Sequence, residues 1–252
     1  CSLIGSTFSN NISGDDGGAI FQRSGDLIID NCQFNNNSSN DDGGAIYNDE
    51  DDMIIMNSEF TNNQAHGDGG AILHDNDNLL IANTAFFSNT SFAGGVIYVD
   101  DGYDIITMNS VFENNSSSNH GGAIYFEDKA VGYFFETQFN INSSTENGGA
   151  LFLENDYLDF DIEIELHHCT FKGNSAGNDG GAIFSNDYQN GRIKVYSSTF
   201  DGNSAGDDGG AIFIEDDGEL LIENTSLIRN SGGDDGGAMV LDGGDVLYEP
   251  HR

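Results

Sequence analysis

The stretch NDDGGAI occupies residues 40–46, and close copies of it occur elsewhere in the chain. GDDGGAI stands at residues 14–20 and again at 206–212, and NDGGAI stands at 178–183. Adjacent glycines lose much conformational entropy on folding, and adjacent carboxylates repel one another. A chain that repeats this unfavourable combination needs it at one recurring position of its fold.

Gly-Gly followed by a small apolar residue occurs nine times, in steps of 25 to 32 residues. The first glycines of the nine pairs are Gly17, Gly43, Gly69, Gly94, Gly121, Gly148, Gly180, Gly209 and Gly236. Such self-similarity at a nearly fixed period is typical of solenoid architectures.

A second phrase, Phe-x-x-Asn, keeps a constant offset from the glycine pair. It precedes Gly-Gly by nine residues in every copy except the fourth, where the offset is eight. Its aromatic residues are Phe8, Phe34, Phe60, Phe86, Phe112, Phe139, Phe171 and Phe200, and the ninth copy has Leu227. Because the repeat covers almost the whole chain, residues 1–252 are predicted to form a single repeat domain.

Strand periodicity is visible in the residues that precede each Phe. Apolar residues recur at alternate positions, seven and five residues before the Phe, as in Leu27 and Ile29, which predicts a strand with one buried face. A Ser, Thr or Cys stands two residues before each aromatic residue, and the change of spacing there indicates a corner at positions such as Asn57. A further short apolar strand follows each Gly-Gly. No segment has a sustained helical period, so about three short strands are expected in each repeat.

These features predict an all-β parallel β-helix of about nine turns with 25 to 32 residues per turn. The phenylalanines are expected to stack inside it, and the Asn three residues later is expected to form an inward ladder that satisfies backbone groups at a corner. The glycine pair is expected where the backbone needs a positive φ or has no room for a Cβ atom. Longer repeats predict insertions at residues 155–161 and 186–191.

The composition is strongly acidic, with 43 acidic and 7 basic residues and a formal charge of −36. No basic patch exists that would bind nucleic acid, and no apolar run is long enough for a transmembrane segment. The chain shows no signal peptide and no terminal caps, so we expect a fragment of a longer repeat protein.

Three cysteines are too few for a disulfide framework. Cys32 and Cys169 occupy the same column of the repeat, five turns apart, and at strand spacing they are too distant to bond. Cys1 falls in the column of Leu27, which is a predicted core position. We expect small buried side chains here, with an intermolecular disulfide through Cys1 as the alternative.

The paired phrases resemble the repeats of the chlamydial polymorphic outer membrane protein family. Gly-Gly-Ala occurs in eight of the nine copies, with Gly-Gly-Val in the fourth, and Phe-x-x-Asn also occurs in eight. The resemblance implies a right-handed β-helix, exposure at a cell surface, and an adhesive or self-associating role in an autotransporter passenger.

Acidic residues just before Gly-Gly are the candidate metal ligands. Stacked turns would place equivalent carboxylates about 4.8 Å apart, and Ca²⁺ prefers several carboxylate and carbonyl oxygens. The candidate Ca²⁺ ligands are Asp15, Asp16, Asp41, Asp42, Asp68, Asp179, Asp207, Asp208, Asp234 and Asp235. The alternative is a solvated acidic face that binds no specific ion.

Catalysis is the other alternative, because polysaccharide-active enzymes of the pectate-lyase and glycosidase kinds share the β-helix fold. Lyases need a basic residue beside carboxylates, and the seven Lys and Arg residues are scattered over the turns. The six histidines share no column, which argues against zinc. Because a catalytic site should break the symmetry of the repeats, the expectation is that the chain is not an enzyme.

The sequence therefore predicts a non-catalytic structural or adhesive module of an extracellular surface or filament protein. Its expected partners are further copies, associated end to end, or other surface proteins and glycans.

Overall fold

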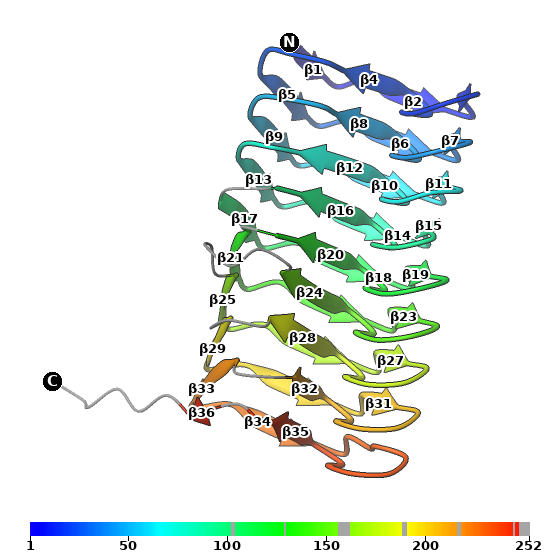
Figure 1. Ribbon diagram of the computed structural model, residues 1–252. Helices are drawn as coiled ribbons and strands as arrows, with labels where there is room; N and C mark the ends of the chain where they lie inside the picture. The colour runs from blue at the N-terminus through cyan, green and yellow to red at the C-terminus, as the bar shows by residue number, and fades with distance from the viewer. Residues whose placement is uncertain are drawn as a thin grey trace, which may run out of the picture.

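The computed structural model describes residues 1–101, 104–128, 130–155, 162–187, 191–215, 218–243 and 245–246. All named elements are β-strands, and they stack as successive turns along one axis (Figure 1). The predicted insertions at 155–161 and 186–191 fall largely on residues 156–161 and 188–190, which lie outside the described residues.

Two parallel sheets, named A and B, come first in each turn. Sheet A contains β1 (Ser2–Ile4), β5 (Leu27–Asp30), β9 (Met53–Met56), β13 (Leu79–Ala82), β17 (Asp104–Met108), β21 (Val131–Phe135), β25 (Glu163–His167), β29 (Arg192–Tyr196), β33 (Glu219–Glu223) and β36 (Asp245–Val246). Sheet B contains β2 (Thr7–Ser9), β6 (Gln33–Asn35), β10 (Glu59–Thr61), β14 (Ala85–Phe87), β18 (Val111–Glu113), β22 (Gln138–Asn140), β26 (Thr170–Lys172), β30 (Thr199–Asp201) and β34 (Ser226–Ile228).

Two further parallel sheets, C and D, complete the turn. Sheet C contains β3 (Ile12–Ser13), β7 (Ser38–Ser39), β11 (Gln64–Ala65), β15 (Thr90–Ser91), β19 (Ser116–Ser117), β23 (Ser143–Ser144), β27 (Ser175–Ala176) and β31 (Ser204–Ala205). Sheet D contains β4 (Ile20–Gln22), β8 (Ile46–Asn48), β12 (Ile72–Asp75), β16 (Ile97–Asp100), β20 (Ile124–Glu127), β24 (Leu151–Asn155), β28 (Ile183–Asp187), β32 (Ile212–Glu215) and β35 (Met239–Asp242).

Each complete turn thus has four strands, and the prediction of about three was wrong. The missed strand is that of sheet C, which has only two residues per turn. Two residues are too few to show an alternating pattern in the sequence. Eight turns contain all four strands, and a ninth lacks the sheet C strand in the part of the chain described, so the prediction of a parallel solenoid of about nine turns is confirmed.

The aromatic residues of the Phe-x-x-Asn phrase form one inward column, as predicted. Phe34 pairs in register with Phe60, and Phe60 with Phe86, along sheet B. Neighbouring rings from Phe8 to Phe200 stack with centroids 4.6 to 5.1 Å apart. Since Phe34, Phe60 and Phe86 are fully buried, this column is a continuous part of the core.

The asparagine of the same phrase forms the predicted inward ladder. The Oδ1 atom of Asn63 accepts hydrogen bonds from the backbone N–H of Asn37 at 3.0 Å and from its side-chain amide at 2.9 Å. The Nδ2 atom of Asn63 also donates to the backbone carbonyl of Phe34 at 3.0 Å. Each buried amide therefore satisfies backbone groups at the corner between sheets B and C.

A second ladder explains the Ser, Thr or Cys that stands two residues before each aromatic residue. The Ser58 hydroxyl accepts from the backbone N–H of Cys32 at 3.0 Å and donates to the carbonyl of Met56 at 2.7 Å. The Cys32 thiol in turn donates to the carbonyl of Asp30 at 3.4 Å. The position needs a small group that both donates and accepts, which hydroxyls and thiols provide.

The two glycines of each pair answer two different requirements. Gly69 has a φ of +63° and a Cβ atom there would lie 2.2 Å from the carbonyl oxygen of Ile72. Gly70 has no positive φ, but its Cβ would lie 2.2 Å from the carbonyl oxygen of Gly95 in the next turn. Both predicted reasons for glycine are therefore correct, and the second glycine is fixed by contact between turns.

The cysteines are all free. Cys32 and Cys169 are buried, as predicted, and burial raises the pKa of the Cys169 thiol to about 12. Cys1 pairs with the Leu27 column, because Ser2 is in register with Ile28, but it is exposed rather than in the core. The first turn has a neighbour on one side only, which explains the difference.

Candidate functional site

The acidic residues before Gly-Gly lie at one corner of the solenoid, between sheets C and D, and form two columns. The residues directly before the glycine pair are here called the inner acids, and those one residue earlier the outer acids. The inner acids are Asp16, Asp42, Asp68, Asp179, Asp208 and Asp235. The outer acids are Asp15, Asp41, Asp207 and Asp234.

The inner acids are structural acceptors. The Oδ1 atom of Asp42 accepts the backbone N–H of Asp68 at 2.7 Å, and the Oδ1 atom of Asp68 accepts that of Ala93 at 3.0 Å. In the later turns, Asp179 accepts from Asp208 at 2.9 Å and Asp208 accepts from Asp235 at 2.6 Å. One oxygen of each of these carboxylates is thus already used to hold the next turn.

Other residue types replace the inner acid in the middle turns. Ala93 offers no acceptor, and the next two positions are His120 and Asn147. The Nδ1 atom of His120 accepts the backbone N–H of Asn147 at 3.2 Å, and the Oδ1 atom of Asn147 accepts that of Asp179 at 3.1 Å. Because neutral groups make the same contact, the contact depends on an acceptor and not on a charge, and the turn of Ala93 does without it.

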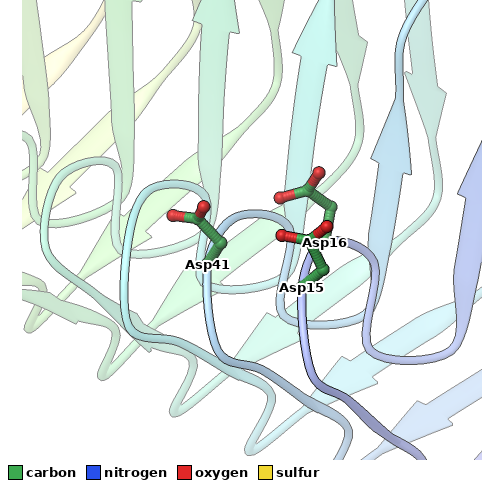
Figure 2. A group of neighbouring side chains, drawn as sticks. All are labelled: Asp15, Asp16 and Asp41. Atoms are coloured by element: carbon green, nitrogen blue, oxygen red, sulfur yellow. The ribbon is translucent and has the colours of Figure 1, made fainter.

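Three of the predicted ligands come together in the first two turns. The carboxylates of Asp15, Asp16 and Asp41 offer oxygens that all lie within 4.8 Å of one another (Figure 2). Asp15 and Asp41 are exposed outer acids, and Asp16 is a partly buried inner acid that also accepts the N–H of Asp42 at 3.3 Å. The cluster therefore presents a set of hard oxygen atoms to solvent.

Burial opposes ionisation of the inner acids. It raises the pKa of Asp16 and of Asp42, against the opposing effect of the N–H groups that they accept. Burial and the nearby charge of Asp42 raise the pKa of Asp68 to about 6. A cation bound beside these partly buried carboxylates would favour their charged form.

The remaining seven predicted ligands form no comparable group in the described ranges. They are Asp42, Asp68, Asp179, Asp207, Asp208, Asp234 and Asp235, and the structure places them in the two columns of the same corner. Binding of Ca²⁺ along this whole edge stays a prediction, and among the described residues the three-carboxylate cluster lies in the first two turns.

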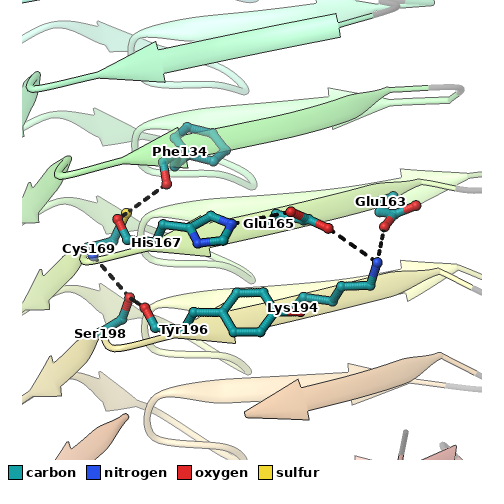
Figure 3. A network of polar contacts seen from close by, with 8 residues as sticks. All are labelled: Phe134, Glu163, Glu165, His167, Cys169, Lys194, Tyr196 and Ser198. Carbon is teal, nitrogen blue, oxygen red and sulfur yellow. Dashed lines mark hydrogen bonds and ion pairs between the residues drawn. The ribbon is translucent and has the colours of Figure 1, made fainter. Parts of the chain in front are cut away.

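A charged patch on the outer face of sheet A was missed in the sequence. Parallel register pairs Glu163 with Arg192 and Glu165 with Lys194. The Lys194 ammonium contacts Glu163 and lies 3.2 Å from Glu165, which also contacts His167 at 3.2 Å (Figure 3). The basic residues look scattered in the sequence because residues that pair in neighbouring turns, such as Glu163 and Arg192, are 29 positions apart.

This patch does not have the properties of a general base. Hydrogen bonding to Glu163 raises the pKa of Lys194, so the amine keeps its proton at neutral pH. A lysine that accepts a proton needs a lowered pKa instead. Glu163, Glu165 and Lys194 are therefore best described as an ion-pair ladder across neighbouring strands.

The comparisons with known proteins agree with this architecture. The family model for the right-handed β-helix region matches residues 1–162. The chain belongs to the right-handed β-helix family. The Chlamydia polymorphic membrane protein repeat matches this β-helix at residues 168–186 and 197–215, which confirms the resemblance seen in the sequence.

The matched repeats indicate that the β-helix is an outer-membrane or surface-associated module. Searches of curated proteins and of solved structures returned no match. Within the described ranges, no helix has the length and apolar character needed to cross a bilayer.

Proposed function

We propose that the chain is a non-catalytic structural or adhesive module of an extracellular surface or filament protein. The observation that supports this most strongly is the uniformity of the columns. The Phe stack runs from Phe8 to Phe200 and the Asn ladder from Asn11 to Asn230, with the same contacts in each turn. A fold that repeats itself along an axis suits a spacer or a multivalent binding module.

The proposed partners are further copies stacked end to end, or other surface proteins and glycans. Ladder contacts are the same in every turn, so an added turn from a longer chain or a second copy would continue them. Side-by-side packing of two copies is opposed by the charge of −36 on each.

Two measurements test this function. Binding of the intact chain to immobilised surface proteins and glycans should be detectable, and sedimentation velocity should show larger species as the concentration rises. Incubation with polygalacturonate and neutral polysaccharides should release no reducing ends and no unsaturated uronides. Turnover that disappears in Lys194→Met or Glu165→Gln would instead establish the alternative, a polysaccharide-active β-helix enzyme.

We further propose that the cluster of Asp15, Asp16 and Asp41 binds Ca²⁺. Its support is the approach of three carboxylates within 4.8 Å. Ca²⁺ tolerates irregular geometry and takes six to eight oxygens, so water and backbone carbonyls would complete the shell. The outer acids Asp15 and Asp41 would supply most of the charge, because Asp16 already accepts a backbone N–H.

Thermal unfolding with Ca²⁺ and with a chelator at equal ionic strength tests this site. At a Ca²⁺ concentration about 100 times Kd, Tm should rise by roughly 5–10 °C. Asp41→Asn should remove most of the rise, and Asp26→Asn, an exposed acid outside the cluster, should retain it. An identical Tm in both buffers would reduce the cluster to a solvated acidic face.

A further inference from the structure

The outer face of sheet A is apolar in the early turns and charged in the later ones. Ile28, Ile54, Leu80 and Ile106 form one outward column there, and they are only partly buried. The same column continues with Tyr133, Glu165 and Lys194. In the early turns the strands are therefore apolar on both faces, as in LIID, MIIM and LLIA.

A second apolar column lies beside the first. Met56, Ala82 and Met108 are neighbours in register on β9, β13 and β17, and each is partly exposed. Phe135 follows in the next turn with 36% of its surface exposed. The two columns together form a continuous surface, here called the apolar face.

A depression lies on the apolar face where β9, β13 and β17 begin. It has a volume of 250 Å³ and is lined by Ile54, Leu80 and Ile106 together with the polar groups of Asp52, Asn78 and Asp104. The Asn78 amide donates to Asp52 at 2.9 Å, and Asn78 Oδ1 accepts the N–H of Asp104 at 3.2 Å. This hydrogen-bonded row gives the depression a fixed acidic rim.

Such a face is unfavourable when it is left in water. Parallel sheets normally have both faces covered, and strands that are apolar on both sides are typical of that arrangement. Contiguous exposed apolar patches on soluble proteins usually mark sites of interaction. The core already fills the other side of these strands, with Ile55 and Ile81 fully buried, so the outward column has no role in the interior.

Charge decides which partner the apolar face fits. Asp30 borders it on one side, in register with Met56, and Asp52 and Asp104 border it on the other. A second copy placed face to face would bring these carboxylates together and add its own charge of −36. An anionic bilayer would be repelled for the same reason.

We propose that the apolar face binds a basic amphipathic polypeptide segment of another protein. Its apolar side chains would lie on Ile54, Leu80 and Ile106, and its Lys or Arg side chains would meet Asp52, Asp104 and Asp30. The apolar face is distinct from the acidic corner, so the peptide proposal and the Ca²⁺ proposal can fail independently of each other. The peptide proposal names a class of partner for the adhesive role proposed above, and it rests on that role.

Peptides of equal charge separate this proposal from general attraction to an acidic protein. The probes are two peptides of about twelve residues, one alternating Lys with Leu and the other alternating Lys with Gln. The intact chain should bind the Lys–Leu peptide about tenfold more tightly at physiological salt. Equal binding of the two peptides would overturn the proposal.

Variants locate the site. The pair Leu80→Gln and Ile106→Gln should abolish the preference for the Lys–Leu peptide, whereas Leu221→Gln, in the same column of the charged half, should retain it. If the double variant does not fold, Ile54→Thr replaces it in the test, because threonine keeps a β-branched side chain suited to a strand and should also weaken the preference. If these variants still preferred the Lys–Leu peptide, the peptide site would not be the apolar face. The proposal would also be contradicted if the wild-type chain formed a concentration-dependent dimer and the variants were monomers. A dimer of that kind would assign the face to a second copy.

Discussion

The Oδ1 atom of Asn89 accepts two hydrogen bonds from Asn63, one from its backbone N–H and one from its side-chain amide, both at 3.0 Å. Asn89 in turn donates to the carbonyl of Phe60 at 3.0 Å. One buried side chain thus satisfies three groups that belong to the preceding turn. Its own neighbour, Asn115, does the same for Asn89 at 2.9 and 3.1 Å.

Removal of one such amide should be costly. Asn89→Ala would leave the backbone N–H of Asn63 and the carbonyl of Phe60 buried without this partner, and each such loss costs about 1–3 kcal/mol. We expect a loss of about 3 kcal/mol or more in the free energy of unfolding, measured by urea denaturation. Gln64→Ala, an exposed position of the adjacent strand β11, should change it by less than about 0.5 kcal/mol. Similar values for the two variants would contradict a structural ladder.

The aromatic stack should tolerate no gap in its middle. Phe112 is fully buried between Phe86 and Phe139, with ring centroids 4.7 and 4.9 Å away. Phe112→Ala should therefore lower the free energy of unfolding by about 3–5 kcal/mol. Phe92, half of whose surface is exposed, is the matched control, and its substitution by Ala should have a much smaller effect. A small loss at Phe112 would mean that neighbouring turns collapse to fill the cavity.

The second glycine of a pair should be irreplaceable although its φ is ordinary. In Gly70→Ala the new Cβ would meet the carbonyl oxygens of Gly95 and Thr90 at 2.2 and 2.7 Å, and both atoms belong to the backbone. Neither atom can move without separating two turns, so a loss of about 3 kcal/mol or more is expected. Gly14→Ala meets nothing within 4 Å and should be neutral or slightly stabilising. Equal thermal stabilities would show that the turns can separate at little cost.

Mild acid should stabilise the protein. Burial, with neighbouring carboxylates as the second cause, raises the pKa of Asp68, Asp75 and Asp100 to about 6 each. An unfolded Asp titrates near 4, so the folded state binds more protons between about pH 4 and 6. By linkage the stability that these groups contribute is lost as the pH rises through 6. We expect the urea midpoint to increase as the pH is lowered from 7.5 to 5.

Two histidines oppose this trend. Burial lowers the pKa of His74 to about 4 and also lowers the pKa of His120, so the stability that they contribute falls as the pH drops below about 6.5. The acidic groups outnumber these histidines, because burial also raises the pKa of Asp42 and Asp179. Asp68→Asn keeps an Oδ1 acceptor for the N–H of Ala93 but cannot ionise, so this variant should show a shallower pH dependence. A urea midpoint that decreases steadily as the pH is lowered from 7.5 to 5 would refute the raised pKa values of these acids.

The candidate site was only partly predictable. The acids before Gly-Gly were recognised from their repetition, but the sequence gives no sign that Asp42 or Asp68 holds the next turn while Asp15 and Asp41 face solvent. That division depends on the φ of the corner residues and on side-chain direction. The ion pairs of Lys194 with Glu163 and Glu165 were likewise hidden, because unequal repeat lengths obscure which residues are in register.

The sequence by itself determined the course of the solenoid: the inward positions of Phe86 and Asn89, the corner at Gly69 and Gly70, and the parallel stacking of turns. The reason is that each turn is the environment of the next, so a residue that repeats at constant spacing meets its own copy and its role follows from the spacing. Only the tertiary structure decided the number of strands in a turn, the hydrogen bonds of the Ser58 hydroxyl and the partial exposure of the outward Leu80. These depend on backbone angles at corners and on which face of a strand is already filled, and neither is encoded in the repeat period.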